Sequence, residues 1–98
     1  MDQQKDQGGQ LQVKVTDDIL KGAYANMVQV GHSPEEFILD FMNVFPPSGI
    51  VTSRVIVSPA HMKRILAMLQ DNLKLYEEKY GKIKAGAVPD QKIGFRTE

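Results

Sequence analysis

The 98-residue sequence contains no cysteine and no tryptophan, and its 12 basic side chains balance its 12 acidic ones. Without cysteine the chain has neither a disulfide framework nor a thiolate metal site. The lack of a basic excess counts against nucleic-acid binding, which usually needs a basic stripe. No run approaches the roughly 18 apolar residues of a membrane-spanning helix, and residues 1–10 lack the apolar core of a signal peptide. We therefore expect a cytoplasmic protein that does not associate with membranes.

The sequence also lacks the motifs that bind cofactors or carry out catalysis. It has no glycine-rich phosphate or dinucleotide loop, no HExxH pair and no nucleophile elbow. A metal site needs two or three ligands at fixed spacing, but nothing in the sequence brings the two histidines, His32 and His61, together. We expect no catalytic residue, no cofactor and no metal ion, and hence no enzymatic activity.

The sequence does have 42% hydrophobic residues, arranged in segments that are typical of strands. Leu11, Val13 and Val15 alternate with polar residues, which predicts a half-buried strand over residues 11–16. Turn residues and β-branched or aromatic residues predict further strands over 23–31, 36–45 and 50–57. The sequence Pro-Pro-Ser-Gly at 46–49 predicts a loop that joins the last two strands into a hairpin.

A long helix is predicted after the strands. Ser58 and Pro59 suit a helix N-cap and first position, and Gly81 suits the residue that follows a helix ending at Tyr80. Apolar residues at helical spacing form one stripe, namely Met62, Ile65, Leu66, Leu69, Leu73, Tyr76 and Tyr80. The expected fold class is α+β, an antiparallel sheet of about four strands followed by one long C-terminal helix packed on one face. This domain spans 11–83, between a flexible tail at 1–10 and a tail at 84–98.

The predicted hairpin register explains a charged residue inside an apolar strand. Cross-strand neighbours in this register are Phe37 and Val57, Ile38 and Ile56, Leu39 and Val55, Asp40 and Arg54, Met42 and Thr52, and Val44 and Ile50. Asp40 could be a general acid or base with a perturbed pKa, or one half of an ion pair with Arg54. We favour the ion pair, because the register supplies the partner. Asn26 and Asn43 also interrupt apolar strands, where an amide either binds a ligand or bonds to backbone groups.

Several segments occur in a characteristic order, namely 24–26 (YAN), 36–41 (EFILDF), 53–61 (SRVIVSPAH), 69–72 (LQDN) and 76–81 (YEEKYG). Together they resemble a family of small bacterial and archaeal proteins that is classified only as a domain of unknown function. The resemblance covers residues 11–83 and implies a prokaryotic, cytoplasmic setting, without any catalytic residues. The predicted order of four strands and a helix is also similar to that of the export chaperone SecB, although no SecB motif is present.

The predicted hairpin is apolar on both faces, whereas one helix covers only one face of an antiparallel sheet. The remaining face carries Ile38, Met42, Val44, Ile50 and Ile56, and large apolar surfaces usually mark interfaces. We expect a homo-oligomer, with a dimer favoured, that works as a protein-interaction module. One alternative is a SecB-like chaperone or ligand-binding module that holds a protein or peptide client on this face. A second is a nucleic-acid-binding accessory protein, although acidic residues interleave with the basic residues of the helix.

Overall fold

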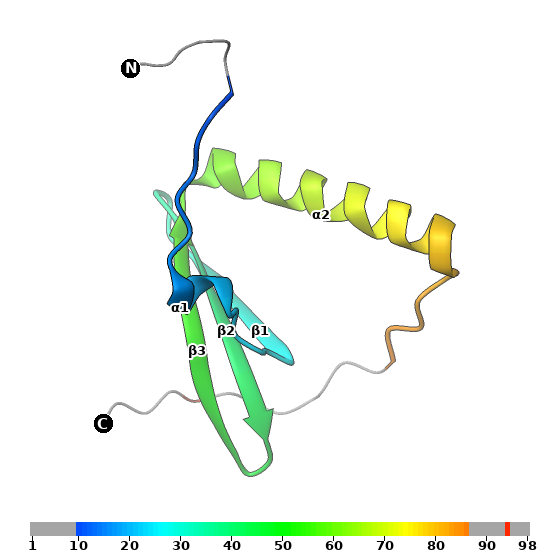
Figure 1. Ribbon diagram of the computed structural model, residues 1–98. Helices are drawn as coiled ribbons and strands as arrows, with labels where there is room; N and C mark the ends of the chain where they lie inside the picture. The colour runs from blue at the N-terminus through cyan, green and yellow to red at the C-terminus, as the bar shows by residue number, and fades with distance from the viewer. Residues whose placement is uncertain (1–9, 87–93, 95–98) are drawn as a thin grey trace. The chain divides into compact units, whose positions relative to one another are not determined.

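The computed structural model describes residues 10–86 and residue 94, and all structural statements below concern these residues. The elements follow the order α1 (Asp17–Leu20), β1 (Met27–His32), β2 (Phe37–Phe45), β3 (Ser48–Val57) and α2 (Pro59–Tyr80) (Figure 1). The chain divides after Pro59 into two compact units, which are described separately as the sheet unit and the helix unit. Residues 1–9 of the predicted tail at 1–10, and Ile93 and Phe95 of the predicted C-terminal tail, lie outside the described residues.

The sheet is an antiparallel meander in which β2 lies between β1 and β3. The expected α+β class, with an antiparallel sheet and one long C-terminal helix, is confirmed. The expected number of about four strands is too high, because the described residues form three. Packing of the helix on one sheet face stays a prediction.

The predicted strand over 11–16 is wrong. Residues 10–16 have no regular structure, and Leu11, Val13 and Val15 are exposed. Alternation of apolar and polar residues predicts a strand only if a neighbouring strand completes its hydrogen bonds, and no described strand lies beside this segment. Thr16 instead occupies the N-cap position of α1, and Asp17 and Asp18 form its first turn. Acidic residues there interact favourably with the helix dipole.

Strand β1 begins later than predicted because a side chain takes over its first pairing positions. The backbone N–H of Asn26 donates to the Met42 carbonyl at 2.9 Å. The Asn26 side chain then donates to the Val44 carbonyl at 3.1 Å and accepts from the Val44 N–H at 2.9 Å. An amide side chain thus replaces a peptide group of the strand. The strand continues one residue beyond the predicted end at 31, to His32, and a turn follows at 33–36.

The β2–β3 hairpin keeps the predicted register over one half of its length only. Phe37, Ile38, Leu39 and Asp40 lie opposite Val57, Ile56, Val55 and Arg54, as the sequence predicts. A β-bulge at Phe41 and Met42 then shifts the pairing by one residue. Met42 lies opposite Val51 and not Thr52, and Val44 lies opposite Gly49 and not Ile50. The connection is also shorter than predicted, because β3 begins at Ser48 and leaves Pro46 and Pro47 as the turn.

The core of the sheet unit is small and lies in the central strand. Among the described residues, the buried ones are Leu39, Asp40 and Met42, all in β2. Strands β1 and β3 are mostly exposed along their length. A sheet with so few buried residues depends heavily on each of them.

Helix α2 begins and ends at the predicted residues, Pro59 and Tyr80. Gly81 follows with a φ of 97°, and its N–H donates to the Glu77 carbonyl at 2.9 Å. This left-handed conformation is the one in which glycine ends many helices. The apolar stripe has the predicted helical spacing, and most of its side chains are exposed in the single chain.

Truncation of a methionine in β2 should show where the sheet is stabilised. Met42 is 3% exposed and Met68, on α2, is 65% exposed. We expect Met42→Ala to lower the free energy of unfolding by roughly 2–5 kcal/mol, because it leaves a cavity in the core. Met68→Ala is the matched control and should cost far less. Urea unfolding curves of both variants measure the difference, and equal losses would contradict the assignment of β2 as the core.

Candidate functional site

The strand register divides the sheet into two faces, because residues directly opposite each other in an antiparallel pair share a face. We call one the Asp40 face; it comprises Met27, Gln29, Gly31, Ile38, Asp40, Met42, Val44, Gly49, Val51, Arg54 and Ile56. We call the other the Leu39 face; it comprises Val28, Val30, His32, Phe37, Leu39, Phe41, Asn43, Phe45, Ser48, Ile50, Ser53, Val55 and Val57. Both faces are predominantly apolar.

The bulge changes the membership of the interface face that the sequence predicts. Ile38, Met42, Val44 and Ile56 do share a face, but Ile50 lies opposite Asn43 and so belongs to the Leu39 face. Val51 lies opposite Met42 and takes the place of Ile50. The extra residue in β3 reverses the side-chain alternation on either side of it, as β-bulges do.

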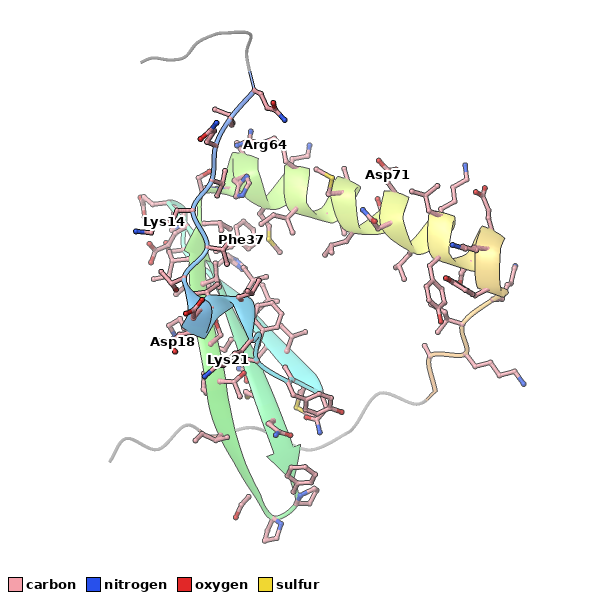
Figure 2. The ribbon with its side chains drawn as sticks, viewed as in Figure 1. Lys14, Asp18, Lys21, Phe37, Arg64 and Asp71 are labelled. Carbon is pink, nitrogen blue, oxygen red and sulfur yellow. The ribbon has the colours of Figure 1, made fainter. Side chains whose placement is uncertain are left out.

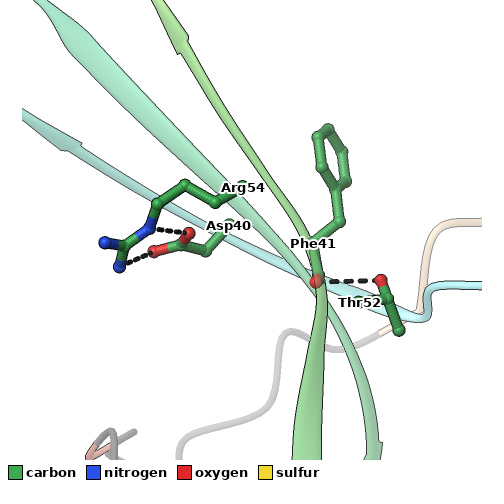
Figure 3. A network of polar contacts seen from close by, with 4 residues as sticks. All are labelled: Asp40, Phe41, Thr52 and Arg54. Atoms are coloured by element: carbon green, nitrogen blue, oxygen red, sulfur yellow. Dashed lines mark hydrogen bonds and ion pairs between the residues drawn. The ribbon is translucent and has the colours of Figure 1, made fainter.

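Asp40 and Arg54 form a bidentate ion pair across the hairpin (Figure 3). Arg54 Nε donates to Asp40 Oδ1 at 2.7 Å, and a terminal guanidinium nitrogen donates to Oδ2 at 3.0 Å. Asp40 is only 5% exposed, while the Arg54 side chain is 54% exposed. The pair therefore satisfies a carboxylate inside an apolar face, where an unpaired one would be costly.

The ion pair also determines the chemistry of Asp40. The hydrogen bonds from Arg54 hold the pKa of Asp40 below its ordinary value, with a further contribution from the charge of Arg54, while desolvation acts in the opposite direction. The same hydrogen bonds raise the pKa of Arg54. A general acid or base at neutral pH needs a carboxyl pKa raised toward that pH. The lowered pKa of Asp40 therefore favours a structural role.

A threonine hydroxyl stabilises the bulge next to the ion pair. Thr52 Oγ1 donates to the Phe41 carbonyl at 3.0 Å (Figure 3). This contact lies where the pairing of β2 and β3 shifts by one residue. Gly49 lies farther along, opposite Val44, and an added Cβ there would approach Val44 Cγ2 to 3.1 Å. The shifted pairing thus leaves little space for a side chain at position 49.

The two asparagines differ in what their amides contact. Asn26 bonds to the backbone of Val44, which is the structural role that the sequence left open. Asn43 Oδ1 is buried without a hydrogen-bond donor among the described residues. It belongs to the Leu39 face, opposite Ile50. A buried acceptor that lacks a donor is uncommon in a completed core.

The histidines do not form a recognisable site. The ring of His32 lies 5.5 Å from the ring of Phe37, at the end of the β1–β2 hairpin. His61 lies in the first turns of α2, in the other unit. Within residues 10–86 and at residue 94, no three His, Asp or Glu side chains are grouped as metal ligands would be. No described helix is both long enough and apolar enough to cross a membrane.

The helix unit carries its own exposed surfaces. Leu66, Leu69 and Leu73 are each more than half exposed on the apolar stripe of α2. Arg64 and Asp71 project from one side of the helix (Figure 2), so this side carries both a basic and an acidic side chain. Such mixed charge is typical of a solvated helix face and provides no continuous basic track for a phosphate backbone.

The acid dependence of stability should reveal the ion pair. Because the pKa of Asp40 is lowered on folding, its contribution is complete above about pH 4 and is lost as the pH falls through the folded-state pKa. Asp40→Asn should therefore flatten the loss of stability in acid. Arg54→Met should reverse the pH dependence that Asp40 contributes. An unpaired buried carboxyl has a raised pKa, so its protonation in acid should then favour the folded state.

Urea midpoints at about pH 7 and pH 3 measure both effects. Asp71→Asn, on the exposed side of α2, is the control and should follow the wild type. If Asp40→Asn and the wild type lost the same stability between these two pH values, the ion pair would contribute nothing to the acid dependence of stability.

Comparison with known proteins identifies a family without adding a function. No curated protein and no solved structure matches the chain. Residues 1–85 match the family described as "Protein of unknown function (DUF3467)". Because this match covers most of the sequence, the chain belongs to the DUF3467 family.

Proposed function

We propose that the protein is a homo-oligomeric interaction module, a dimer in its simplest form, in which a second copy covers the Asp40 face. The observation that carries this proposal is that a three-stranded sheet is apolar on both faces. An antiparallel sheet with one solvated face normally alternates apolar and polar residues. Here the polar side chains of the Asp40 face are Gln29, Asp40 and Arg54.

The exposed residues of the Asp40 face are of the kind that interfaces use. Val51 and Ile56 are exposed at the β3 side of the face; Val51 lies opposite the buried Met42, and Ile56 lies opposite Ile38. Single exposed apolar residues are ordinary, but contiguous apolar patches are rare on monomers and mark contact surfaces. A second copy would remove this surface from water, at roughly 25 cal/mol of stabilisation per Å² of apolar area.

The Asp40–Arg54 pair is compatible with burial in such an interface. Asp40 is already buried within one chain, so association would desolvate mainly the guanidinium of Arg54. A bidentate arginine–carboxylate pair keeps both oxygens bonded while water is removed. Its fixed geometry would also restrict how a second copy can lie on the face, so it favours specificity more than affinity.

The helix unit points to the same need for a partner. Helices in proteins obtain most of their stability from tertiary packing of an apolar face. The stripe of α2 has seven apolar positions, and Met68 and Leu75 widen it. A homo-oligomer offers a surface for this stripe as well as for the sheet. A client-binding module would expose the same surfaces, and the experiment below separates the two.

Two neighbouring residues of β3 provide a sharp test. Val51→Glu places a charge on the Asp40 face and should split the oligomer, whereas Ile50→Glu places it on the Leu39 face and should leave the Asp40 interface intact. Light scattering after size exclusion, repeated over a hundredfold dilution, gives the mass of each form. A wild type that is a compact monomer at micromolar concentration would refute the proposal and favour client binding.

A further inference from the structure

We infer that α2 pairs with α2 of a second copy as an antiparallel two-stranded coiled coil, in which Lys63 of each copy forms an ion pair with Glu77 of the other. This inference rests on the proposed function and adds to it the contact of the helix unit, while the Asp40 face remains the contact of the sheet unit. Both contacts are self-complementary. Two copies form both of them if the contacts share one two-fold axis, and four copies do so otherwise.

The apolar residues of α2 have the spacing of a coiled coil. They recur at alternating intervals of four and three residues, and we call this set the seam: Met62, Leu66, Leu69, Leu73, Tyr76 and Tyr80. These are the d and a positions of successive heptads, whose repeat keeps one line of side chains facing a partner helix. Apart from Met62, the seam residues are at least half exposed in the single chain.

The positions that flank the seam are mostly polar. One flank, the e positions, carries Lys63, Gln70 and Glu77, and the other, the g positions, carries Ile65, Asn72 and Lys79. A helix that packs broadly in a globular core usually has apolar residues at e or g as well as at a and d. The narrow seam with a fully polar e flank therefore favours another helix as the partner.

The charges of the e flank identify this helix as a second copy in the reverse direction. Lys63 and Glu77 lie at equal distances on either side of Gln70. In an antiparallel pair the e positions face each other, so each Lys63 meets Glu77 of the second copy and Gln70 meets Gln70. In a parallel pair each g position faces the next e position, which places Ile65 beside Gln70 and Asn72 beside Glu77. Only the antiparallel pair brings opposite charges together.

The same register distributes the large side chains evenly. It places Leu69 opposite Leu73 of the second copy at the centre, and Met62 opposite Tyr80 at each end. The rings of Tyr76 and Tyr80 lie 4.9 Å apart, so the C-terminal end of the seam is its bulky end. Large residues opposite smaller ones allow the layers of a core to interdigitate. A parallel pair would instead gather all four tyrosine rings at one end.

The carboxylate of Glu77 has the capacity for this ion pair. Its Oε2 accepts a hydrogen bond from the Ile83 N–H at 3.0 Å, just beyond the end of the helix. An ionised carboxylate has two acceptor oxygens with several lone pairs, so it accommodates a lysine ammonium in addition. The apolar residues Met68 and Leu75 lie outside the seam, and the coiled coil leaves them available for packing on a sheet.

Charge exchange tests both the partner and its direction. Lys63→Glu or Glu77→Lys turns both intermolecular pairs into like-charge pairs, and each should raise the dissociation constant roughly tenfold, because two surface pairs change sign together. An equimolar mixture of the two variants restores opposite charges and should regain the wild-type mass. Light scattering after size exclusion, over a hundredfold dilution at low salt, measures the mass, since salt screens such pairs.

The matched controls make the same charge changes one residue away. Arg64→Glu and Glu78→Lys lie at f positions, which face away from the seam, and each should keep the wild-type mass. Their equimolar mixture carries the same opposite net charges as the test mixture, so it controls for general attraction between acidic and basic chains. Circular dichroism should show equal helix content in all four variants.

The outcomes separate this inference from the proposed function. Dissociation by Lys63→Glu and by Glu77→Lys, with recovery in their mixture and unchanged controls, supports the coiled coil. An oligomer that Val51→Glu splits but neither helix variant weakens overturns the coiled coil and leaves the Asp40 interface standing. Dissociation by the helix variants but not by Val51→Glu supports the coiled coil and overturns the Asp40 interface. Dissociation without recovery in the mixture overturns the antiparallel register, and a monomeric wild type overturns both proposals.

Discussion

The register of the β2–β3 hairpin depends on the ion pair between Asp40 and Arg54. Apolar residues alone would specify this register weakly, because both faces are apolar and a slip of one residue would still put valine or isoleucine opposite phenylalanine or leucine. A slip would, however, leave a buried carboxylate without its guanidinium. Since that state is costly, two charged residues select one register among several that apolar contacts would tolerate.

The bulge then decides which side chains the Asp40 face presents. On the helix side of Thr52 the alternation follows the ion pair, and on the turn side it is reversed. Val51 consequently lies beside Met42, while Ile50 lies on the Leu39 face. One hydroxyl hydrogen bond, from Thr52 to the Phe41 carbonyl, occupies the backbone acceptor at this point. The composition of the Asp40 face thus depends on where the bulge lies.

The elements that could be predicted from the sequence are those with local signals. Helix α2 has a serine–proline start and a glycine after its end, both of which act within a few residues. The pairing from Phe37 to Asp40 follows from one charge pair. The bulge could not be predicted, because threonine and serine are ordinary strand residues and give no local sign of a shift in pairing. The prediction of a strand over 11–16 is wrong because the alternation of apolar and polar residues does not reveal whether a neighbouring strand exists. Thr16, Asp17 and Asp18 do provide a local signal, since they are typical of a helix start.

A shortage of buried surface links the sheet to assembly. A chain of this size buries only about two-thirds of its unfolded surface even when it is compact, and here the buried residues of the described sheet are confined to β2. Three strands are also fewer than the four to six of a typical sheet. A second copy that covers the Asp40 face would remove its exposed apolar residues, such as Val51 and Ile56, from water. Because the strands bury so little within one chain, the apolar Asp40 face is the surface where association would add most to the stability of the fold.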